Sequence, residues 1–338
     1  MKCFGLNVLL LLALFFTAAS GAQAACHLPG NIYNESQIYR LAGDVNGDGI
    51  VNINDVTSLI DILLTAGPQQ AQGSVADVNQ DGVVSIVDIT ELITYLLRGV
   101  WEHEEMQDQT FAVGDVTFKM IAVKGGTFTM GATPEQGSDA YDREKPAFEA
   151  TLSDYYIGQT EVTQALWVAV MGDNPSFSTG DLNLPVERVT WNDCQDFIAK
   201  LNEMTGKNFR MPTEAEWEFA ARGGNKSQGY KYSGSNDVNE VAWYQGNSME
   251  QSHIVATKSP NELGLYDMSG GVWEWCQDWL GNYVGEPQTN PTGPESGTFR
   301  ILRGGSWYGA VGYCRISYRG YYMPGGYSGD LGLRLVLQ

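Results

Sequence analysis

The feature that most restricts the fold of this chain is a duplicated loop rich in acidic and amide residues. The segment GDVNGDGIVNINDVTSLIDILL recurs as ADVNQDGVVSIVDITELITYLL. Each copy places oxygen-bearing side chains at loop positions 1, 3, 5, 9 and 12, glycine at position 6, and a backbone carbonyl at position 7. Oxygen ligands at this spacing surround a hard cation, so the sequence predicts one Ca²⁺ per loop. The predicted ligands are Asp44, Asn46, Asp48, Ile50, Asn52 and Asp55, then Asp77, Asn79, Asp81, Val83, Ser85 and Asp88.

Each loop is followed by a segment with apolar residues at helical spacing. The apolar positions match between the copies: Ile53, Val56, Leu59, Ile60, Leu63 and Leu64 correspond to Ile86, Ile89, Leu92, Ile93, Leu96 and Leu97. Such a stripe faces a core, and neither short helix can bury it alone, so we expect the two helices to pack together. The alternative interpretation is a pair of Asx-rich turns that bind no metal.

A duplicated loop and helix with Asp rather than Glu at position 12 resembles a type I dockerin, over residues 41–99. The resemblance implies a small all-α module that binds a cohesin-bearing partner, often in secreted assemblies that degrade polysaccharide. In that family the residues after loop position 9 contact the cohesin, and these are Ile53-Asn54 and Ile86-Val87 in this chain. They lack the Ser/Thr pairs common in cellulosomal dockerins.

The first 24 residues have the pattern of an export signal. Lys2 precedes an apolar run over residues 8–16, and the small residues Ala22 and Ala24 suit signal peptidase. A lipoprotein anchored through Cys26 is a weaker alternative, because Gln23 stands where an apolar residue is expected. No other apolar run could span a bilayer. Localisation is therefore predicted as secreted, periplasmic, or held at the cell surface by a partner, with residues 25–40 as a short N-terminal segment.

Charge and metal-ligating residues limit the partners further. The formal net charge is -20, which disfavours nucleic acid and anionic membranes and favours divalent cations. With only three histidines, His27, His103 and His253, a histidine-rich metal centre is not expected. Four cysteines remain after signal removal, Cys26, Cys194, Cys276 and Cys314, and their spacing does not choose among the three full disulfide pairings.

A polar linker over residues 100–110 separates the first module from a second domain at residues 111–338. Helices are predicted at 161–171, 191–204 and 213–222. The last begins after Pro212 with a capping box between Thr213 and Glu216. Elsewhere turns and short aromatic segments dominate, which favours an irregular α+β domain with few regular strands.

Five ordered motifs mark this domain: GGTFTMGAT, RMPTEAEWEFAARGG, NELGLYDMSGGVWEW, RGGSWYGAVGYCRISYR and LGLRL. Together they resemble the formylglycine-generating enzyme family, also called the sulfatase-modifying factor family, from about residue 113 to the end. The resemblance implies that family's variant of the C-type lectin fold.

Enzymes of this family bind Cu(I) through two cysteines and use oxygen to oxidise a substrate cysteine to formylglycine. The resemblance places the second copper cysteine at Cys314, an active-site serine at Ser306 and a pocket tryptophan at Trp273, but the first copper cysteine falls on Gly309. Glycine supplies no ligand, and one thiolate binds Cu(I) far more weakly than two. We therefore do not expect a copper cofactor. Cys276, near Trp273, is the alternative second sulfur, and its other interpretation is a buried hydrophobic residue.

The resemblance also implies a structural calcium site in the large domain. The family's ligand pattern falls on the side chains of Asp267 and Glu274 and the carbonyls of Gly270 and Val272. These hard oxygen donors suit Ca²⁺.

Aromatic residues are concentrated near the carboxyl end of the chain. Tyrosine combines an apolar face with a hydroxyl group, and binding surfaces are rich in it, so we expect at least one exposed patch that contacts a glycan or peptide. The alternative is that these rings form core. The predicted surface comprises Trp307, Tyr308, Tyr313, Tyr318, Tyr321, Tyr322 and Tyr327.

Three functions remain open at this point. The favoured one is a dockerin-tethered ligand-binding or accessory module that has lost copper oxidation. The second is an oxidase with an altered copper site, which requires Cys276 or Cys26 near Cys314. The third is a purely structural component that acts only through its cohesin.

Overall fold

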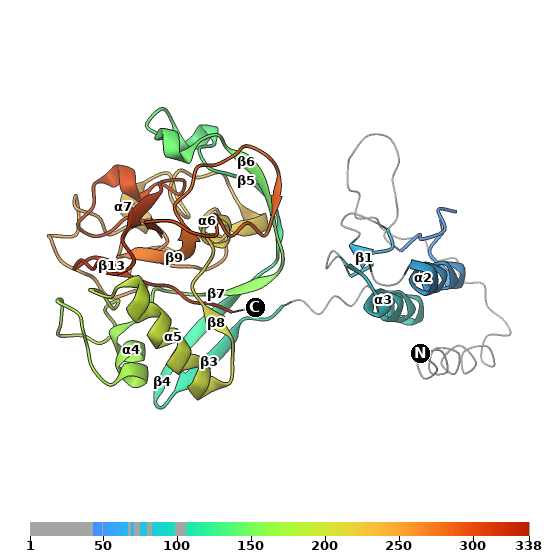
Figure 1. Cartoon of the computed structure of the whole chain (residues 1–338), viewed down its shortest axis with the longest axis horizontal. Coiled ribbons are helices and arrows are strands. Elements are labelled where there is room, and N and C mark those ends of the chain that lie inside the picture. Colours follow the sequence, from blue (N-terminus) through green and yellow to red (C-terminus); the bar gives the residue numbers. More distant parts are fainter. Residues whose placement is uncertain are drawn as a thin grey trace. The chain divides into compact units, whose positions relative to one another are not determined.

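The computed structural model of the chain describes residues 43–48, 50–66, 69–70, 75–79, 83–98 and 106–337. Two compact units, Met1–Glu104 and Glu105–Gln338, make up the chain and are described separately (Figure 1). The predicted export signal, residues 25–40, most of the linker and Asp81 lie outside the described residues. Within the described ranges, no helix is long and apolar enough to cross a membrane.

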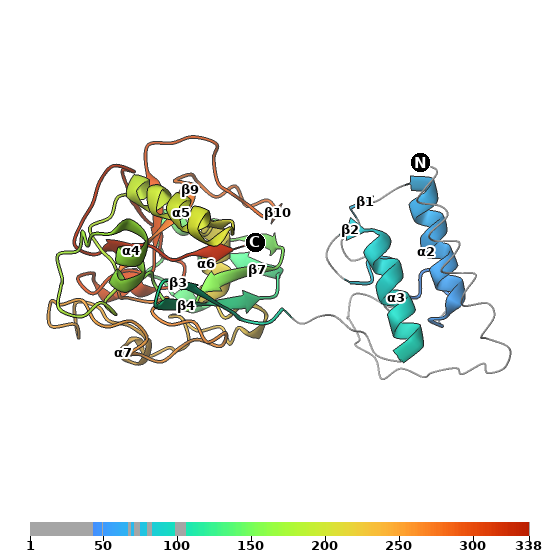
Figure 2. The same cartoon turned by 90° about the horizontal axis from the view of Figure 1, so that it is seen from below.

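The described residues of the smaller unit form two helices and one pair of two-residue strands. Helix α2 (Ile53–Ala66) and helix α3 (Ile86–Arg98) lie side by side in both views (Figures 1 and 2). The two-residue strands β1 (Gln69–Gln70) and β2 (Val83–Val84) pair antiparallel. The buried core of this unit comprises Val56, Leu59, Ala76, Val78, Val84, Ile89 and Leu92.

The predicted packing of the two helices is confirmed, but the apolar stripe is wider than the interface. Ile53, Leu64, Ile86 and Leu97 were expected in the core and are instead 51–77% exposed. Each helix has one helical partner, which covers only a strip of a broad apolar face. The residues near the helix ends therefore face solvent.

The larger unit contains three sheets built from short strands. Its strands are β3 (Gln109–Val113), β4 (Val116–Val123), β5 (Gly126–Met130), β6 (Phe148–Leu152), β7 (Tyr155–Gly158), β8 (Phe209–Arg210), β9 (Trp273–Trp279), β10 (Gln288–Thr289), β11 (Arg300–Arg303), β12 (Gly320–Tyr322), β13 (Leu331–Gly332) and β14 (Val336–Leu337). The sheet orders are β3-β4-β7-β14-β8, β12-β11-β9-β13 and β10-β6-β5. Strand β14 brings the end of the chain between β7 and β8, so the first and last segments of the unit share one sheet (Figure 1).

Helices cover these sheets where the sequence predicts them. The helices of the larger unit are α4 (Gln164–Met171), α5 (Trp191–Thr205), α6 (Glu214–Ala221) and the short α7 (Val238–Val241), with 3-10 turns η1 (Pro134–Gln136), η2 (Asp142–Glu144), η3 (Gly224–Lys226) and η4 (Val311–Cys314). Thr163, Thr190 and Thr213 cap α4, α5 and α6 through their side chains. The predicted capping box is present, since Glu216 N donates to Thr213 Oγ1 and Thr213 N donates to a Glu216 carboxylate oxygen.

Two large apolar clusters form most of the core of the larger unit, and a smaller one surrounds Cys314. One lies under α4 and α5 and includes Trp167, Phe197 and Trp275, with the Trp167 and Phe197 rings stacked at 4.8 Å between centroids. The other surrounds α6, which contacts β5, β6, β9 and β11. All residues of α6 are buried, so this helix is the centre of the unit.

Candidate functional site

The predicted copper loop is held in place by backbone hydrogen bonds to two distant segments. Trp307 N donates to Gly271 O at 2.6 Å, and Gln245 N donates to Gly309 O at 3.0 Å. Ser306 is buried, and its hydroxyl donates to Asp330 Oδ2 at 2.7 Å. The serine is therefore fixed by a carboxylate rather than free in a cleft.

Gly309 lies where the resemblance places the first copper cysteine. It is buried, and a Cβ atom added there would lie 3.3 Å from the N, O and Oγ atoms of Ser306. Such contacts are tighter than ordinary packing. This position supplies no ligand, and a side chain there would require Ser306 to shift by a few tenths of an ångström.

Cys314 is fully buried at the end of η4. It packs with Tyr232, Val238, Val241 and Ala242, and burial raises the pKa of its thiol to about 12. A soft metal ion or a substrate reacts with the thiolate, not the thiol. At neutral pH the Cys314 side chain is consequently a protonated core residue.

The other described cysteines belong to different parts of the core. Cys194, Cys276 and Cys314 are free thiols, and each lies in a separate apolar cluster. Burial, with the nearby Asp278 and Glu214 carboxylates, raises the pKa of Cys276 well above its usual range. Cys26 lies outside the described residues. Cys276 therefore has the environment of a structural thiol.

Trp273, the predicted pocket tryptophan, begins an aromatic cluster. Its ring lies 6.0 Å from Tyr313 and 5.8 Å from Tyr318, and those two tyrosines are 4.7 Å apart. The Arg143 guanidinium lies 4.8 Å from the Tyr318 ring and 4.7 Å from the Tyr141 ring. Cations within this distance are attracted to ring faces. The cluster therefore combines apolar surface with one positive charge.

We define the aromatic surface as Tyr141, Arg143, Trp273, Tyr313, Tyr318 and Tyr321. Tyr141 is 50% exposed and Tyr321 is 43% exposed, whereas Tyr318 is buried. Arg143 also lies 5.8 Å from the Tyr321 ring, and its Nε donates to Arg319 O at 2.6 Å. Tyr141 and Arg143 are far from the carboxyl-terminal aromatics in sequence, so no sequence pattern connects them with that segment.

The remaining predicted aromatics do not all join this surface. Trp307 and Tyr308 contact each other at 5.5 Å, and Tyr308 is exposed. Tyr327 is exposed and lies 5.5 Å from the Arg188 guanidinium. Tyr322 is exposed on β12. The seven predicted residues thus include core, a central cluster and separate exposed rings.

The predicted calcium ligands of the larger unit lie beside an arginine. Both oxygens of buried Glu274 accept hydrogen bonds from Arg334, and Oε2 also accepts from Trp217 Nε1 at 2.7 Å. Asp267 Oδ2 accepts from Ala256 N at 2.7 Å, and burial raises the pKa of Asp267 to about 6. Arg334 already supplies positive charge to Glu274, so the donors do not form a preformed cation cage. Calcium at Asp267, Gly270, Val272 and Glu274 stays a prediction.

A third carboxylate, Glu161, was not identified from the sequence. It is buried, and its Oε1 accepts from Val272 N at 2.7 Å. Burial and the charges of Asp267 and Glu274 raise its pKa well above the usual range. Nevertheless, in the part of the chain that the structure describes, no group of three or more His, Cys, Asp or Glu residues is arranged to hold a metal ion.

The two loops of the smaller unit share one hydrogen-bonding pattern. In the first, the buried Asp55 carboxylate accepts from Asn46 N at 3.1 Å and Asn52 N at 2.7 Å. In the second, Asp88 accepts from Asn79 N at 3.1 Å and Ser85 N at 2.7 Å. The position-12 aspartate therefore closes each loop around its positions 3 and 9.

We expect calcium removal to unfold the smaller unit before the larger one. Ions that bind the folded loops but not the unfolded chain stabilise the folded state, so a chelator removes that contribution. Far-UV circular dichroism during heating, with and without EGTA, measures the effect on the full chain. Asp88→Asn should reproduce the EGTA result in part, whereas Asp61→Asn, on the exposed side of α2, should not. Identical melting curves with and without EGTA would contradict the prediction.

Comparison with known proteins identifies both units. The family model described as "Sulfatase-modifying factor enzyme 1-like domain" matches residues 109–338. The chain belongs to this family. The model of the type I dockerin domain matches residues 42–97, so the predicted family resemblance is confirmed for both modules and in the predicted order. Type I dockerins are calcium-binding modules that bind cohesins and occur in extracellular assemblies.

Relatives of the larger unit differ in their named functions. A protein named "Chaperone protein LppX" from Paenibacillus barcinonensis is 36% identical over 65% of this chain and 90% of its own length. The formylglycine-generating enzyme of Streptomyces coelicolor is 31% identical over 63% of this chain and 87% of its own length. The family therefore includes formylglycine-generating enzymes, but membership alone does not fix activity.

A solved structure supports the predicted fold. Treponema denticola variable protein 1 superposes with a TM-score of 0.63 at 35% identity, covering 69% of this chain and 99% of its own. The expected α+β fold of the formylglycine-generating enzyme family, the family's variant of the C-type lectin fold, is thereby confirmed for the larger unit.

Proposed function

We propose that this chain is a secreted, dockerin-tethered member of the sulfatase-modifying factor family whose larger unit binds a ligand and does not oxidise cysteine. The observation that carries the proposal is the glycine at position 309 together with the buried thiol of Cys314. The family's copper chemistry needs two thiolates, but position 309 lacks a sulfur and Cys314 is a buried thiol with a raised pKa.

The aromatic surface supports a binding role. The exposed rings of Tyr141 and Tyr321 lie 4.7 and 5.8 Å from the Arg143 guanidinium. Trp273, Tyr313 and Tyr318 are more buried. Aromatic rings and a cation on a rigid scaffold bind glycans or peptides without losing much side-chain entropy. The dockerin would bring this surface to a cohesin-bearing assembly, and a glycan ligand would suit an assembly that degrades polysaccharide.

The proposal is tested on the full chain in one experiment with two measurements. We expect binding on a glycan and peptide array and no formylglycine in a sulfatase-motif peptide incubated with copper and oxygen. Tyr321→Ala should weaken binding about tenfold, because exposed aromatic anchors often contribute more than 1 kcal/mol. Phe177→Ala removes an exposed ring outside the aromatic surface and should have no effect.

Two results would replace this proposal with one of its alternatives. Formylglycine production that is lost in Cys314→Ser would establish the oxidase and would require Cys276 or Cys26 as the second sulfur. Absence of any array ligand, together with cohesin binding, would favour a purely structural component.

A further inference from the structure

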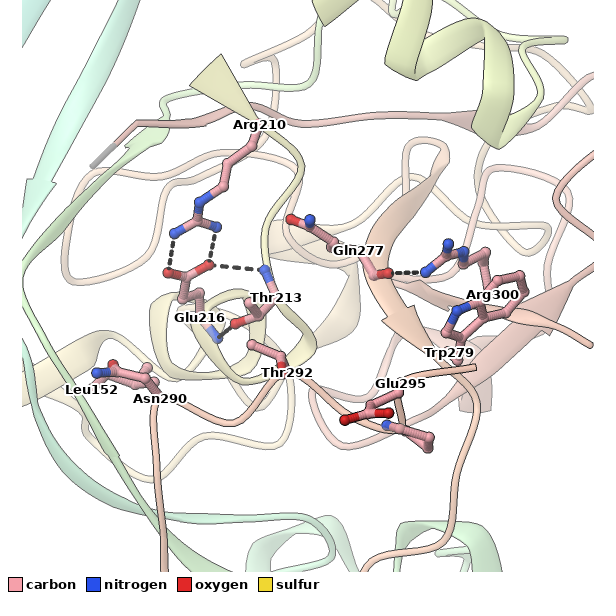
Figure 3. Close-up of a pocket in the computed structure, with 11 residues that line it drawn as sticks. Leu152, Arg210, Thr213, Glu216, Gln277, Trp279, Asn290, Thr292, Glu295 and Arg300 are labelled. Carbon is pink, nitrogen blue, oxygen red and sulfur yellow. Dashed lines mark hydrogen bonds and ion pairs between the residues drawn. The ribbon is translucent and has the colours of Figure 1, made fainter. Parts of the chain in front are cut away.

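A pocket of about 470 Å³ with a mixed polar and apolar lining lies in the larger unit, and its lining includes no residue of the aromatic surface. It lies where the start of α6 and the end of β9 meet the segment 290–300 (Figure 3). Its volume is within the range of small-molecule sites. The lining residues are Leu152, Arg210, Thr213, Glu216, Gln277, Trp279, Asn290, Thr292, Pro294, Glu295 and Arg300.

Two fixed groups form opposite sides of this pocket (Figure 3). On one side Arg210 and Glu216 form a bidentate ion pair, with N–O distances of 2.6 and 2.7 Å. On the other, the Arg300 guanidinium lies between two indole rings, 3.9 Å from Trp191 and 3.5 Å from Trp279, and donates to Gln277 O. Stacking and ion pairing hold both arginines, so the walls are organised before a ligand binds.

Several polar groups in the pocket have unused hydrogen-bonding capacity. The side chains of Gln277, Thr292 and Glu295 are exposed and form no side-chain hydrogen bond or ion pair with any residue that the structure describes. The Arg300 Nε–H is buried, and it too has no partner among the described residues. That donor is covered in this structure, so the accessible hydrogen-bonding capacity is that of the Gln277, Thr292 and Glu295 side chains.

The charges of the lining constrain the ligand. Arg210 and Arg300 are balanced by Glu216 and Glu295, so the pocket has no net charge to attract an anion or a cation. Leu152, Pro294 and Trp279 contribute apolar surface, so the lining combines apolar faces with polar groups. Donors and acceptors are mixed over the whole lining.

We propose that this pocket binds a neutral saccharide unit. Each sugar hydroxyl both donates and accepts a hydrogen bond, which matches an amide, a hydroxyl, a carboxylate and a guanidinium placed around one cavity. A neutral sugar also leaves the balanced charge of the lining unchanged. This site is separate from the aromatic surface, and the proposal does not depend on the ligand of that surface.

Isothermal titration calorimetry of the full chain in calcium buffer tests the proposal. The probes are cellotriose, xylotriose and mannotriose, with trigalacturonic acid as the anionic comparison. We expect at least one neutral trisaccharide to bind, and the double variant Gln277→Leu/Thr292→Val to weaken it by at least about tenfold. Both substitutions remove hydrogen-bonding groups from exposed side chains with little change in volume, so the fold is retained.

Two control variants make the result specific to the pocket. Thr117→Val makes the same hydroxyl-to-methyl change on an exposed position of β4 and should leave affinity unchanged. Tyr321→Ala should also leave it unchanged, even if the function proposed for the aromatic surface fails. The proposal is overturned if no neutral trisaccharide binds at roughly 10 mM, if binding survives the double variant, or if the uronic acid binds more tightly.

Discussion

Arg303→Leu should lower the free energy of unfolding of the larger unit by about 3–5 kcal/mol, the range for breaking a buried ion pair. The Arg303 side chain is fully buried and pairs with Glu218 and Glu214 of α6. Its Nη1 also donates to Ile316 O at 2.9 Å and Tyr318 O at 2.6 Å. Leucine leaves these carboxylates and carbonyls with fewer donors in a site that water does not reach.

Chemical denaturation followed by tryptophan fluorescence measures this change on the full chain. All tryptophans except Trp101 lie between Trp167 and Trp307, so the signal reports the larger unit. Arg303→Lys keeps the charge but not the planar donor set and should give an intermediate loss. Lys200→Leu, on the exposed face of α5, should change stability by less than about 0.5 kcal/mol. An equally small change for Arg303→Leu would show that the network contributes little.

The same network marks the limit of what the sequence predicts. Helix α6 was predicted from local signals, because Thr213 and Glu216 form their capping box within one turn. Its burial could not be predicted in this way. Alternating glutamates on a helix ordinarily indicate a solvated face, but Glu214, Glu216 and Glu218 are all buried. Glu216 and Glu218 have the nearby partners Arg210 and Arg222. The further partners Arg303 and Arg319, which pair with Glu214 and Glu218, are distant in sequence.

The candidate sites also differ in whether local sequence or the folded chain brings their residues together. The calcium loops are predicted from local patterns, and in each loop the position-9 N–H donates to the position-12 aspartate. The aromatic surface depends on Arg143, which reaches Tyr318 only through the folded chain. The pocket proposed to bind a saccharide joins residues from β6, β8, α6, β9 and the segment 290–300. No spacing rule connects such segments, so only the fold reveals that their side chains meet.

Asp278→Asn should stabilise the larger unit increasingly as the pH rises. Burial and the charges of Glu214 and Glu216 raise the pKa of Asp278 to about 8, against the lowering effects of the Glu214 N–H donor and of Arg319. The carboxyl has a pKa of about 4 in the unfolded chain. Between that pH and the folded value, the native state keeps a proton that the unfolded chain has released. The free energy of unfolding of the wild type therefore falls as the pH rises through this range.

Asparagine cannot ionise and can still accept from Glu214 N, which donates to Asp278 Oδ2 at 2.9 Å in the wild type. The variant therefore does not lose stability in this way. The difference in free energy of unfolding between the variant and the wild type should grow by about 4 kcal/mol between about pH 5 and pH 9, at 1.36 kcal/mol per pKa unit. Denaturation curves of both proteins at each pH give the difference directly. Asp115→Asn, on the exposed turn between β3 and β4, should keep the wild-type pH dependence. Parallel stability profiles for wild type and Asp278→Asn would mean that Asp278 is ionised in the folded protein, and that Arg319 outweighs the burial of this carboxyl.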